Sequence, residues 1–283
     1  MNGPTPETST ILIVGLARNC GNRITKTLKR LVESASAFKT AHFLIIESDS
    51  TDTTVSELEK AQSAMPNFRY IALGDLRIKY PLRTDRIAFC RNAYIDQLAS
   101  HSSYSDVSYI LVCDMDGVSR SLSTRNITSC WHPSAPRWDV CTANQGDFYY
   151  DIWALRHPIW CPGDAWKEHD LLAPVVGEIA AKEISIYSRM IHIPAERPMI
   201  EVDSAFGGLA IYRRSAFVAG RYRGIDDSGR EICEHVVFHS ALRKKGFRIF
   251  INPRMISART TENAKAKSPL QQFRRLVRDC LKL

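Results

Sequence analysis

Features that would assign this chain to a membrane or secreted class are missing from its sequence. No stretch approaches the ~18–20 consecutive apolar residues of a membrane-spanning helix. The N-terminus lacks a charged region followed by an apolar run, and the apolar segment 11–16 is too short for a signal-peptide core. No internal repeat or low-complexity segment is present. These absences predict a globular protein in the cytoplasm.

The cysteine spacing of zinc-binding domains is also missing. None of the eight cysteines forms a C-x-x-C pair, and most lie within apolar or helical stretches. This distribution argues against a zinc knuckle. It favours buried, reduced thiols in a reducing compartment.

The overall composition is ordinary for a globular protein. Of the 283 residues, 45% are hydrophobic and 24% are charged, so the chain can bury a core of its own. The formal net charge of +8 suits acidic partners such as nucleic acid, phosphorylated ligands or an anionic membrane. Much of this excess positive charge lies in the final third of the chain, so it is distributed unevenly along the sequence.

Short apolar runs alternate with segments whose apolar residues repeat at helical spacing. Strands are predicted at 10–16, 42–46, 68–73, 109–113, 138–143, 148–156 and 247–253, the last one ended by a proline. Helices are predicted to begin near residues 22, 54, 84 and 233, and 157–200 is predicted as a helix with flanking loops. This alternation favours βαβ units and a mainly parallel sheet. Residues 1–9 are expected to be a flexible leader.

The central motif is Asp114-Met115-Asp116, which follows the apolar run 109–113. Side chains alternate along an extended chain, so both aspartates lie on the same side. Neighbouring like charges are unfavourable unless a cation lies between them, and hard divalent ions prefer oxygen ligands. The motif therefore predicts a metal site, with a solvated turn after a strand as the alternative.

Further acidic residues follow the strand predicted at 42–46. In a parallel α/β sheet, ligands bind beyond the carboxyl ends of the strands. Asp49 and Asp52 lie at such an end, as do Asp114 and Asp116. Although Asp49 and Asp114 are 65 residues apart in the sequence, we expect them to line one crevice.

Two charged residues lie on apolar helix faces. Arg91 shares a face with Ile87 and Ile95, and an inward arginine is costly unless it meets an anion. The candidate anions are the Asp114 edge or a bound phosphate, and the alternative is that the side chain extends out to solvent. Glu234 leads another apolar face, where it either serves the site or only stabilises the helix start.

In this order, the motifs resemble those of GT-A glycosyltransferases over about residues 10–254. Residues 49–53, Asp-Ser-Thr-Asp-Thr, are similar to the nucleotide-contacting segment of family 2 enzymes. Asp114-Met-Asp116 matches the metal-binding Asp-x-Asp, Gly207 and Gly208 are similar to the acceptor-side glycine loop, and residues 233–235 stand where an x-Glu-Asp motif opens a helix. More narrowly, the stretches 86–92, 148–156 and 234–239 with 252–253 resemble the family 69 capsule-associated mannosyltransferases of fungi.

The resemblance implies a single GT-A domain with a mixed, mainly parallel sheet flanked by helices. Its nucleotide-sugar half would cover about 10–120 and its acceptor half about 121–254, followed by a basic amphipathic tail at 255–283. The implied activity is transfer of a sugar, mannose under the narrower resemblance, from a GDP- or UDP-linked donor to a hydroxyl of a glycan or glycolipid. Mn²⁺ or Mg²⁺ is the implied cofactor, and nucleic acid is not an expected partner.

The predicted site has four groups of residues. Catalytic roles fall to Glu234, Arg91 and His235. Nucleotide contacts fall to Arg18, Asn19, Glu47, Asp49, Asp52, Arg86 and Asp114. Acceptor or sugar contacts fall to Asp151, Trp153, Gly207 and Gly208. Metal binding falls to Asp114, Asp116 and His239.

The chemistry of sugar transfer suits these residue types. Negative charge grows on the leaving diphosphate, and a divalent ion, Arg86 and Arg91 would offset it. Glu234 would accept the hydroxyl proton if the enzyme inverts configuration. Family 69 enzymes retain configuration, in which case Glu234 is no direct base, so the stereochemistry stays open. His235 stands where the family commonly has Asp, and no histidine follows His239. The metal would then take only aspartates and water, or one of these two histidines.

Two other functions fit less well. A nucleotidyltransferase would have a glycine- and arginine-rich phosphate loop with a lysine after the first strand, whereas residues 17–22 contain a single glycine. A nucleic-acid-binding module would interleave aromatic and basic residues on one surface. The basic residues here cluster in loops and in the tail instead.

The basic tail carries one apolar stripe at helical spacing. Its members are Leu270, Phe273, Val277, Cys280 and Leu281. Such a stripe either docks on the domain, which we favour, or lies on an anionic membrane as a peripheral contact at its inner surface.

Overall fold

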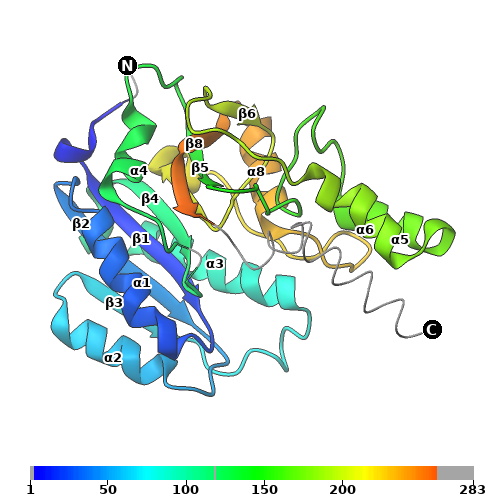
Figure 1. The fold of residues 1–283 in the computed structure, drawn as a ribbon. Coiled ribbons are helices and arrows are strands. Elements are labelled where there is room, and N and C mark those ends of the chain that lie inside the picture. Colours follow the sequence, from blue (N-terminus) through cyan, green and yellow to red (C-terminus); the bar gives the residue numbers. More distant parts are fainter. Residues whose placement is uncertain (1–2, 118, 260–283) are drawn as a thin grey trace.

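The computed structural model describes residues 3–117 and 119–259, which form an α/β domain around one sheet (Figure 1). The eight strands of this sheet lie in the order β3-β2-β1-β4-β7-β5-β8-β6. Their bounds are β1 Thr10–Ala17, β2 Thr40–Glu47, β3 Phe68–Ala72, β4 Val107–Asp114, β5 Val140–Gln145, β6 Ile200–Val202, β7 Leu209–Arg213 and β8 Ile249–Ala258.

The sheet is mixed, as predicted. Strands β3, β2, β1 and β4 are parallel neighbours, and β5 is parallel to β8. Strand β7 runs antiparallel between β4 and β5, and β6 is antiparallel to β8 at the edge. The carboxyl ends of β1, β2 and β4 therefore meet at one edge of the sheet.

Helices cover both faces of the sheet, which explains the nearly continuous apolar runs of the strands. Along β1, Ile11 and Ile13 pack with the core that includes α1, whereas Leu12 and Val14 pack with the core that includes α3 and α8. The helices are α1 Gly21–Ser34, α2 Thr54–Ala64, α3 Arg83–Ser100, α4 Thr124–Thr128, α5 Ala165–Val176, α6 Glu178–Ser185, α7 Arg214–Phe217 and α8 Glu234–Lys244. Short 3-10 helices occur at Pro6–Thr8, Ser102–Tyr104, Ser129–Trp131 and Tyr187–Arg189.

The cysteines within the described ranges are buried free thiols, as predicted from their apolar surroundings. They are Cys20, Cys90, Cys113, Cys130, Cys141, Cys161 and Cys233.

The segment 148–156 is not a strand, which corrects the prediction. It is an irregular stretch with one isolated bridge, between Arg156 and Ser204. Tyr149 and Leu155 are fully buried, so the apolar pattern reflects a loop that packs into the core. The Asp151 carboxylate accepts a hydrogen bond from the Gly207 amide at 2.9 Å and fastens the loop to the sheet.

Strand β8 does not end at Pro253, contrary to the prediction. The register with β5 shifts between Thr142 and Asn144, and β8 continues to Ala258. A bulge leaves residues out of the ladder, so a proline without an N–H is tolerated there. The domain therefore extends beyond the predicted boundary at residue 254.

The described part of the predicted leader, residues 3–9, makes contacts with the domain. The Pro4 carbonyl accepts hydrogen bonds from the Tyr109 hydroxyl at 2.7 Å and the Trp131 indole at 3.1 Å. At the other end, residues 255–258 belong to β8. The predicted apolar stripe of the tail lies outside the described residues.

The segment 157–200 contains two helices instead of the single helix predicted. Helices α5 and α6 form a hairpin that projects from one end of the domain (Figure 1). No helix within 3–117 and 119–259 has the length and apolar character needed to cross a membrane.

Candidate functional site

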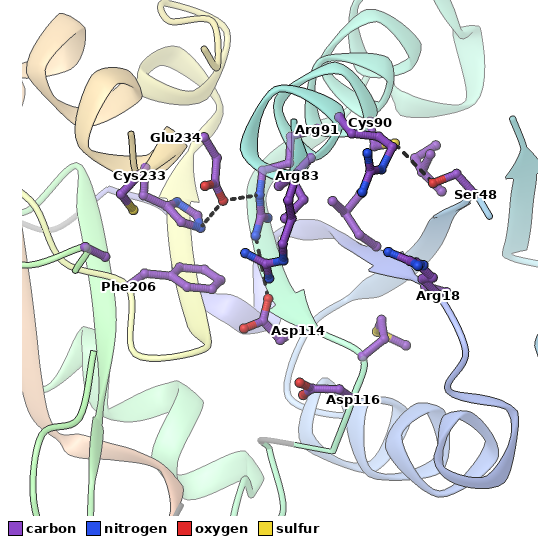
Figure 2. A pocket seen from close by; sticks show the side chains of 18 of the residues that line it. Arg18, Ser48, Arg83, Cys90, Arg91, Asp114, Asp116, Phe206, Cys233 and Glu234 are labelled. Carbon is purple, nitrogen blue, oxygen red and sulfur yellow. Dashed lines mark hydrogen bonds and ion pairs between the residues drawn. The ribbon is translucent and has the colours of Figure 1, made fainter. Parts of the chain in front are cut away.

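A cavity of about 520 Å³ opens beside the carboxyl ends of β1 and β4. The end of β2, helix α3, the loop 148–156, Phe206 and the start of α8 also contribute to its wall. Figure 2 shows Ser48, Arg91, Phe206 and Glu234 among the lining side chains. This is the edge where ligands bind in open α/β sheets. Ten of the predicted site residues line the cavity: Arg18, Asp49, Arg86, Arg91, Asp114, Asp116, Asp151, Trp153, Glu234 and His235.

Arg91 points inward and joins two sides of the cavity. Its Nε lies 3.0 Å from Glu234 Oε1, and its Nη2 lies 3.6 Å from Asp114 Oδ1 (Figure 2). Only 5% of Arg91 is exposed. The inward orientation and the Asp114 partner agree with the prediction from helical spacing, so the side chain does not extend out to solvent.

Two aromatic rings and a hydroxyl complete the surroundings of Arg91. The guanidinium carbon lies 5.3 Å from the Phe206 ring centre and 5.6 Å from that of Tyr222, and Nη1 donates to the Tyr94 hydroxyl at 3.1 Å. Burial alone would lower the pKa of Arg91, but Tyr94, Glu234 and the other acidic neighbours raise it. The guanidinium therefore stays charged and fixed in one position.

Asp114 and Asp116 lie at the floor and the rim of the cavity. Burial raises the pKa of Asp114 to about 7. The negative charges of Asp116 and Asp151 also raise this pKa, whereas the positive charge of Arg91 lowers it. Asp116 is exposed, and its carbonyl accepts a hydrogen bond from Arg23 Nη1 at 3.1 Å. This is a site where negative charges crowd together and a cation would relieve them.

The donor set fits a hard divalent ion that takes only part of its coordination from protein. No group of three or more His, Cys, Asp or Glu side chains suited to a metal occurs in the described part of the chain. Mg²⁺ and similar ions are commonly held by one or two carboxylates together with phosphate oxygens and water. Asp114 and Asp116 provide that pair.

His239, which was predicted as a metal ligand, lies in the core and does not line the cavity. The ring is fully buried. Its Nδ1 lies 3.0 Å from Ser204 Oγ and its Nε2 lies 2.9 Å from the Tyr212 hydroxyl. Both ring nitrogens are therefore occupied by hydrogen bonds within the core. Burial lowers the pKa of His239 to about 3, so the ring is neutral.

Asp49 lies at the far side of the cavity from Glu234, beyond the end of β2. Its φ of +58° places it in the left-handed region, and its Oδ1 accepts a hydrogen bond from the Leu76 amide at 3.0 Å. The Nε atoms of Arg86 and Arg77 each lie 3.6 Å from the carboxylate. Burial would raise the pKa of Asp49, but hydrogen bonds from Ser48 and Leu76, with the charge of Arg86, lower it overall.

Three predicted nucleotide-binding residues build the loops beside the cavity and do not line it. Asp52 accepts hydrogen bonds from the Gly21 amide at 3.0 Å and the Thr54 amide at 2.9 Å, which ties the starts of α1 and α2 together. Asn19 Oδ1 accepts from the Thr51 amide at 2.8 Å, and Glu47 Oε1 from the Ser50 amide at 3.0 Å.

The glycine pair also acts through its backbone. Gly207 and Gly208 have φ values of +67° and +81° and do not line the cavity. A Cβ atom on Gly207 would lie 2.7 Å from the Ala143 carbonyl oxygen, so a side chain at this position would clash with the backbone of β5. The Gly207 amide holds Asp151, and the Gly208 carbonyl accepts from the Asp114 amide at 3.0 Å. The pair therefore positions two cavity carboxylates.

Glu234 and His235 form the first turn of α8. Glu234 is 7% exposed, and His235 is 3% exposed with its ring stacked on Phe206 at 3.8 Å between centres. His235 Nε2 lies 3.7 Å from Glu234 Oε1, and neither ring nitrogen has a hydrogen-bond partner among the described residues. Burial, with the nearby charge of Arg91, lowers the pKa of His235 well below its ordinary value.

Arg83 and Phe206 are two of the cavity residues that were not predicted. Arg83 lies at the start of α3, three residues before Arg86, and its spacing on the same helix face was the available signal. Phe206 directly precedes the glycine pair and lies between Arg91 and His235. Only its position beside Gly207 in the sequence pointed to it.

Comparison with known proteins agrees with an α/β fold of the GT-A type. No family model and no curated protein matches this chain. Among solved structures, it is similar to the mannosyltransferase PcManGT from Pyrobaculum calidifontis in complex with GDP-Man and Mn²⁺. The TM-score is 0.52 at 12% identity, over 98% of this chain and 66% of that one. This similarity identifies the GT-A fold predicted from the motifs.

Two further solved structures are similar to the chain at lower scores. The first is S. aureus TarS 1–349, with a TM-score of 0.49 and 10% identity over 89% of this chain and 60% of that one. The second is glucosyl-3-phosphoglycerate synthase from Mycobacterium tuberculosis in complex with UDP, with a TM-score of 0.44 and 13% identity over 94% of this chain and 75% of that one. The chain thus spans about three fifths to two thirds of the length of PcManGT and TarS 1–349.

Proposed function

We propose that this protein is a metal-dependent glycosyltransferase that moves mannose from a GDP- or UDP-linked donor to a hydroxyl of a glycan or glycolipid. The observation that carries the proposal is the link from Asp114 through Arg91 to Glu234 across one cavity. Further support comes from the GT-A fold and from PcManGT, whose structure holds GDP-Man and Mn²⁺. The stretches that resemble family 69 enzymes support mannose.

The donor would lie between the ends of β1, β2 and β4. Arg18, Arg83 and Arg86 line this side of the cavity and present positive charge to a diphosphate. Asp49, which lines this side with its Oδ2 3.6 Å from Arg86 Nε, would accept from the base or ribose. Asp114 and Asp116 would hold Mn²⁺ or Mg²⁺. When bound, this ion would offset the charge of the leaving diphosphate.

The acceptor would lie between the loop 148–156 and the start of α8. Asp151, Trp153 and His235 line this side, and Arg91 holds Glu234 by Oε1. Glu234 Oε2 would then accept the proton of the attacking hydroxyl if the reaction inverts configuration. If it retains configuration, Glu234 would bind the acceptor without acting as the base. The anomeric form of the product, read by proton NMR, distinguishes these two cases.

The first loop disfavours nucleotidyl transfer. A phosphate loop needs free amides at the start of its helix. Here the Cys20 amide donates to Thr54 Oγ1 at 2.8 Å and the Gly21 amide donates to Asp52 Oδ2 at 3.0 Å. Both amides are used within the protein.

A panel of nucleotide sugars tests the proposal. The protein is incubated with Mn²⁺ and each donor, and the release of nucleotide diphosphate is measured. We expect release with a GDP- or UDP-linked sugar and its loss in Asp116→Ala. Release that survives in Asp116→Ala would remove the metal from the proposal. If calorimetry detects no binding of UDP, GDP or CDP, the transferase proposal itself is wrong.

A further inference from the structure

Contacts within the α5–α6 hairpin fix its two helices relative to each other. Gly177 joins the helices; its amide donates to the Ala173 carbonyl at 2.9 Å and its carbonyl accepts from the Ala181 amide at 3.0 Å. His169, which is 8% exposed, lies between carboxylates of both helices, 3.0 Å from Asp170 and 3.2 Å from Glu178. The hairpin is therefore fixed as it leaves the domain (Figure 1).

The tip of this hairpin is apolar and open to solvent. Residues 171–177 contain no charged side chain. The exposed fractions are 72% for Leu171, 80% for Val175, 43% for Val176 and 63% for Ile179. Folding does not require bulky aliphatic side chains to be this exposed. A cluster of them on one surface marks a site of interaction.

A lipid surface suits this tip better than a second copy of the chain. A stable protein interface takes about 20–30 residues from each partner, whereas the apolar tip consists of residues 171–177 with Ile179 beside it. A bilayer needs no complementary shape, and it accepts uncharged aliphatic side chains. Backbone N–H and C=O groups at the ends of the two helices would have no hydrogen-bond partners in the hydrocarbon core. The tip would therefore enter only the boundary between headgroups and acyl chains.

The stem of the hairpin carries the residues expected at the headgroup level. Trp166 is 37% exposed, and the Lys182 ammonium lies 5.2 Å from the centre of its ring. Tryptophan and lysine prefer this level of a membrane. At ~1.5 Å per helical residue, Trp166 lies about 8–13 Å from the tip along α5, similar to the ~5–10 Å to which interfacial helices are buried.

We propose that the tip of the α5–α6 hairpin inserts into the interfacial layer of a phospholipid bilayer. Lys167 and Lys182 are outnumbered by the acidic residues of the two helices, which are Glu168, Asp170, Glu178 and Glu183. Insertion therefore needs no anionic lipid, and zwitterionic phosphatidylcholine is enough. This inference is independent of the proposed transferase activity, because vesicle binding is measured without donor or acceptor.

Flotation of the full chain with phosphatidylcholine vesicles tests the proposal. The variant L171S/V175S/I179S removes three exposed aliphatic side chains from the tip. The matched control is Ile78→Ser, because Ile78 is 91% exposed and lies in the loop before α3. We expect the wild type and Ile78→Ser to float and the tip variant to bind at least ~tenfold more weakly, since apolar burial drives insertion. Circular dichroism confirms that all three are folded.

Three results would overturn the proposal. The first is a wild type that does not bind the vesicles. The second is a tip variant that binds as well as the wild type, which would assign binding to another segment. The third is a dimer that light scattering detects in the wild type and not in the tip variant, without vesicle binding, which would make the tip an interface between copies. As a second readout, brominated phosphatidylcholine should quench wild-type fluorescence more than that of Trp166→Phe.

Discussion

The Nε of Arg91 donates to Glu234 Oε1 at 3.0 Å, and this contact joins α3 to α8 across the candidate site. Both side chains are more than nine-tenths buried. The same guanidinium reaches Asp114 at the end of β4. The spacing between the β4 side and the α8 side of the cavity therefore depends on one arginine.

Removing Arg91 should weaken both folding and transfer. In Arg91→Met, Glu234 would lose its partner in a buried place, and breaking a buried pair typically costs about 3–5 kcal/mol. The double variant R91M/E234Q should recover part of this loss, because it leaves no unpaired charge, yet it should stay inactive. Urea unfolding of the four proteins measures the coupling. A loss in the double variant equal to the sum of the losses in Arg91→Met and Glu234→Gln would show that the pair has no energetic link.

If the reaction inverts configuration, Glu234→Gln should almost abolish transfer while donor binding is retained. The amide keeps the shape of the side chain but cannot accept a proton at the reaction step. Calorimetry with the nucleotide and the release of nucleotide diphosphate report the two properties separately. Asp203→Asn, on an exposed carboxylate outside the cavity wall, is the matched control. Unchanged turnover in Glu234→Gln would remove Glu234 from the mechanism.

The main features of the cavity could be predicted because they follow from regular structure. Parallel strands place their carboxyl ends at one edge, which brought Asp49 and Asp114 to the same cavity. Helical spacing placed Arg91 on an inward face, and burial then required an anion, which Asp114 and Glu234 supply. Each of these inferences needed only the type and direction of a helix or strand, its side-chain repeat, and the sign of the charges on it.

The roles of loop residues could not be predicted in the same way. Asp52 and Asn19 are polar residues at strand ends, and the sequence does not tell whether a ligand or a backbone amide will satisfy them. The amides they meet are fixed by the loop conformation, including the φ of +48° at Asn19. The alternating pattern of residues 148–156 fits a strand and also a loop whose aromatic side chains enter the core. Only the tertiary packing distinguishes the two.

Asp52→Ala should lower stability without removing a contact to the donor. Each lost hydrogen bond at a helix start costs about 1 kcal/mol. Hydrogen bonds from Thr54 and Gly21 lower the pKa of Asp52 below 3.8 in the folded state. The carboxylate thus contributes stability above about pH 4, and this contribution is lost as the pH falls through the folded pKa. Urea unfolding at pH 7 and at pH 3 should show a smaller difference between wild type and Asp52→Ala at the lower pH. A constant difference would mean that the charge has no part in it.

His239→Gln should make the protein less sensitive to acid and leave the metal site intact. The folded pKa of about 3 lies below the ordinary 6.5 because the ring is buried. Below pH 6.5 the unfolded chain therefore takes up a proton that the folded chain does not, and stability falls as the pH drops towards 3. Glutamine cannot take up this proton, so the loss of unfolding free energy between pH 7 and pH 4.5 should be smaller in the variant. At pH 7 the variant should itself be less stable, because the contacts with Ser204 and Tyr212 are disturbed.

The metal site is tested by calorimetry of nucleotide binding with and without Mn²⁺. Mn²⁺ should increase the affinity for the nucleotide by the same factor in the wild type and in His239→Gln. If the enhancement disappeared in folded His239→Gln, the histidine would belong to the metal site after all.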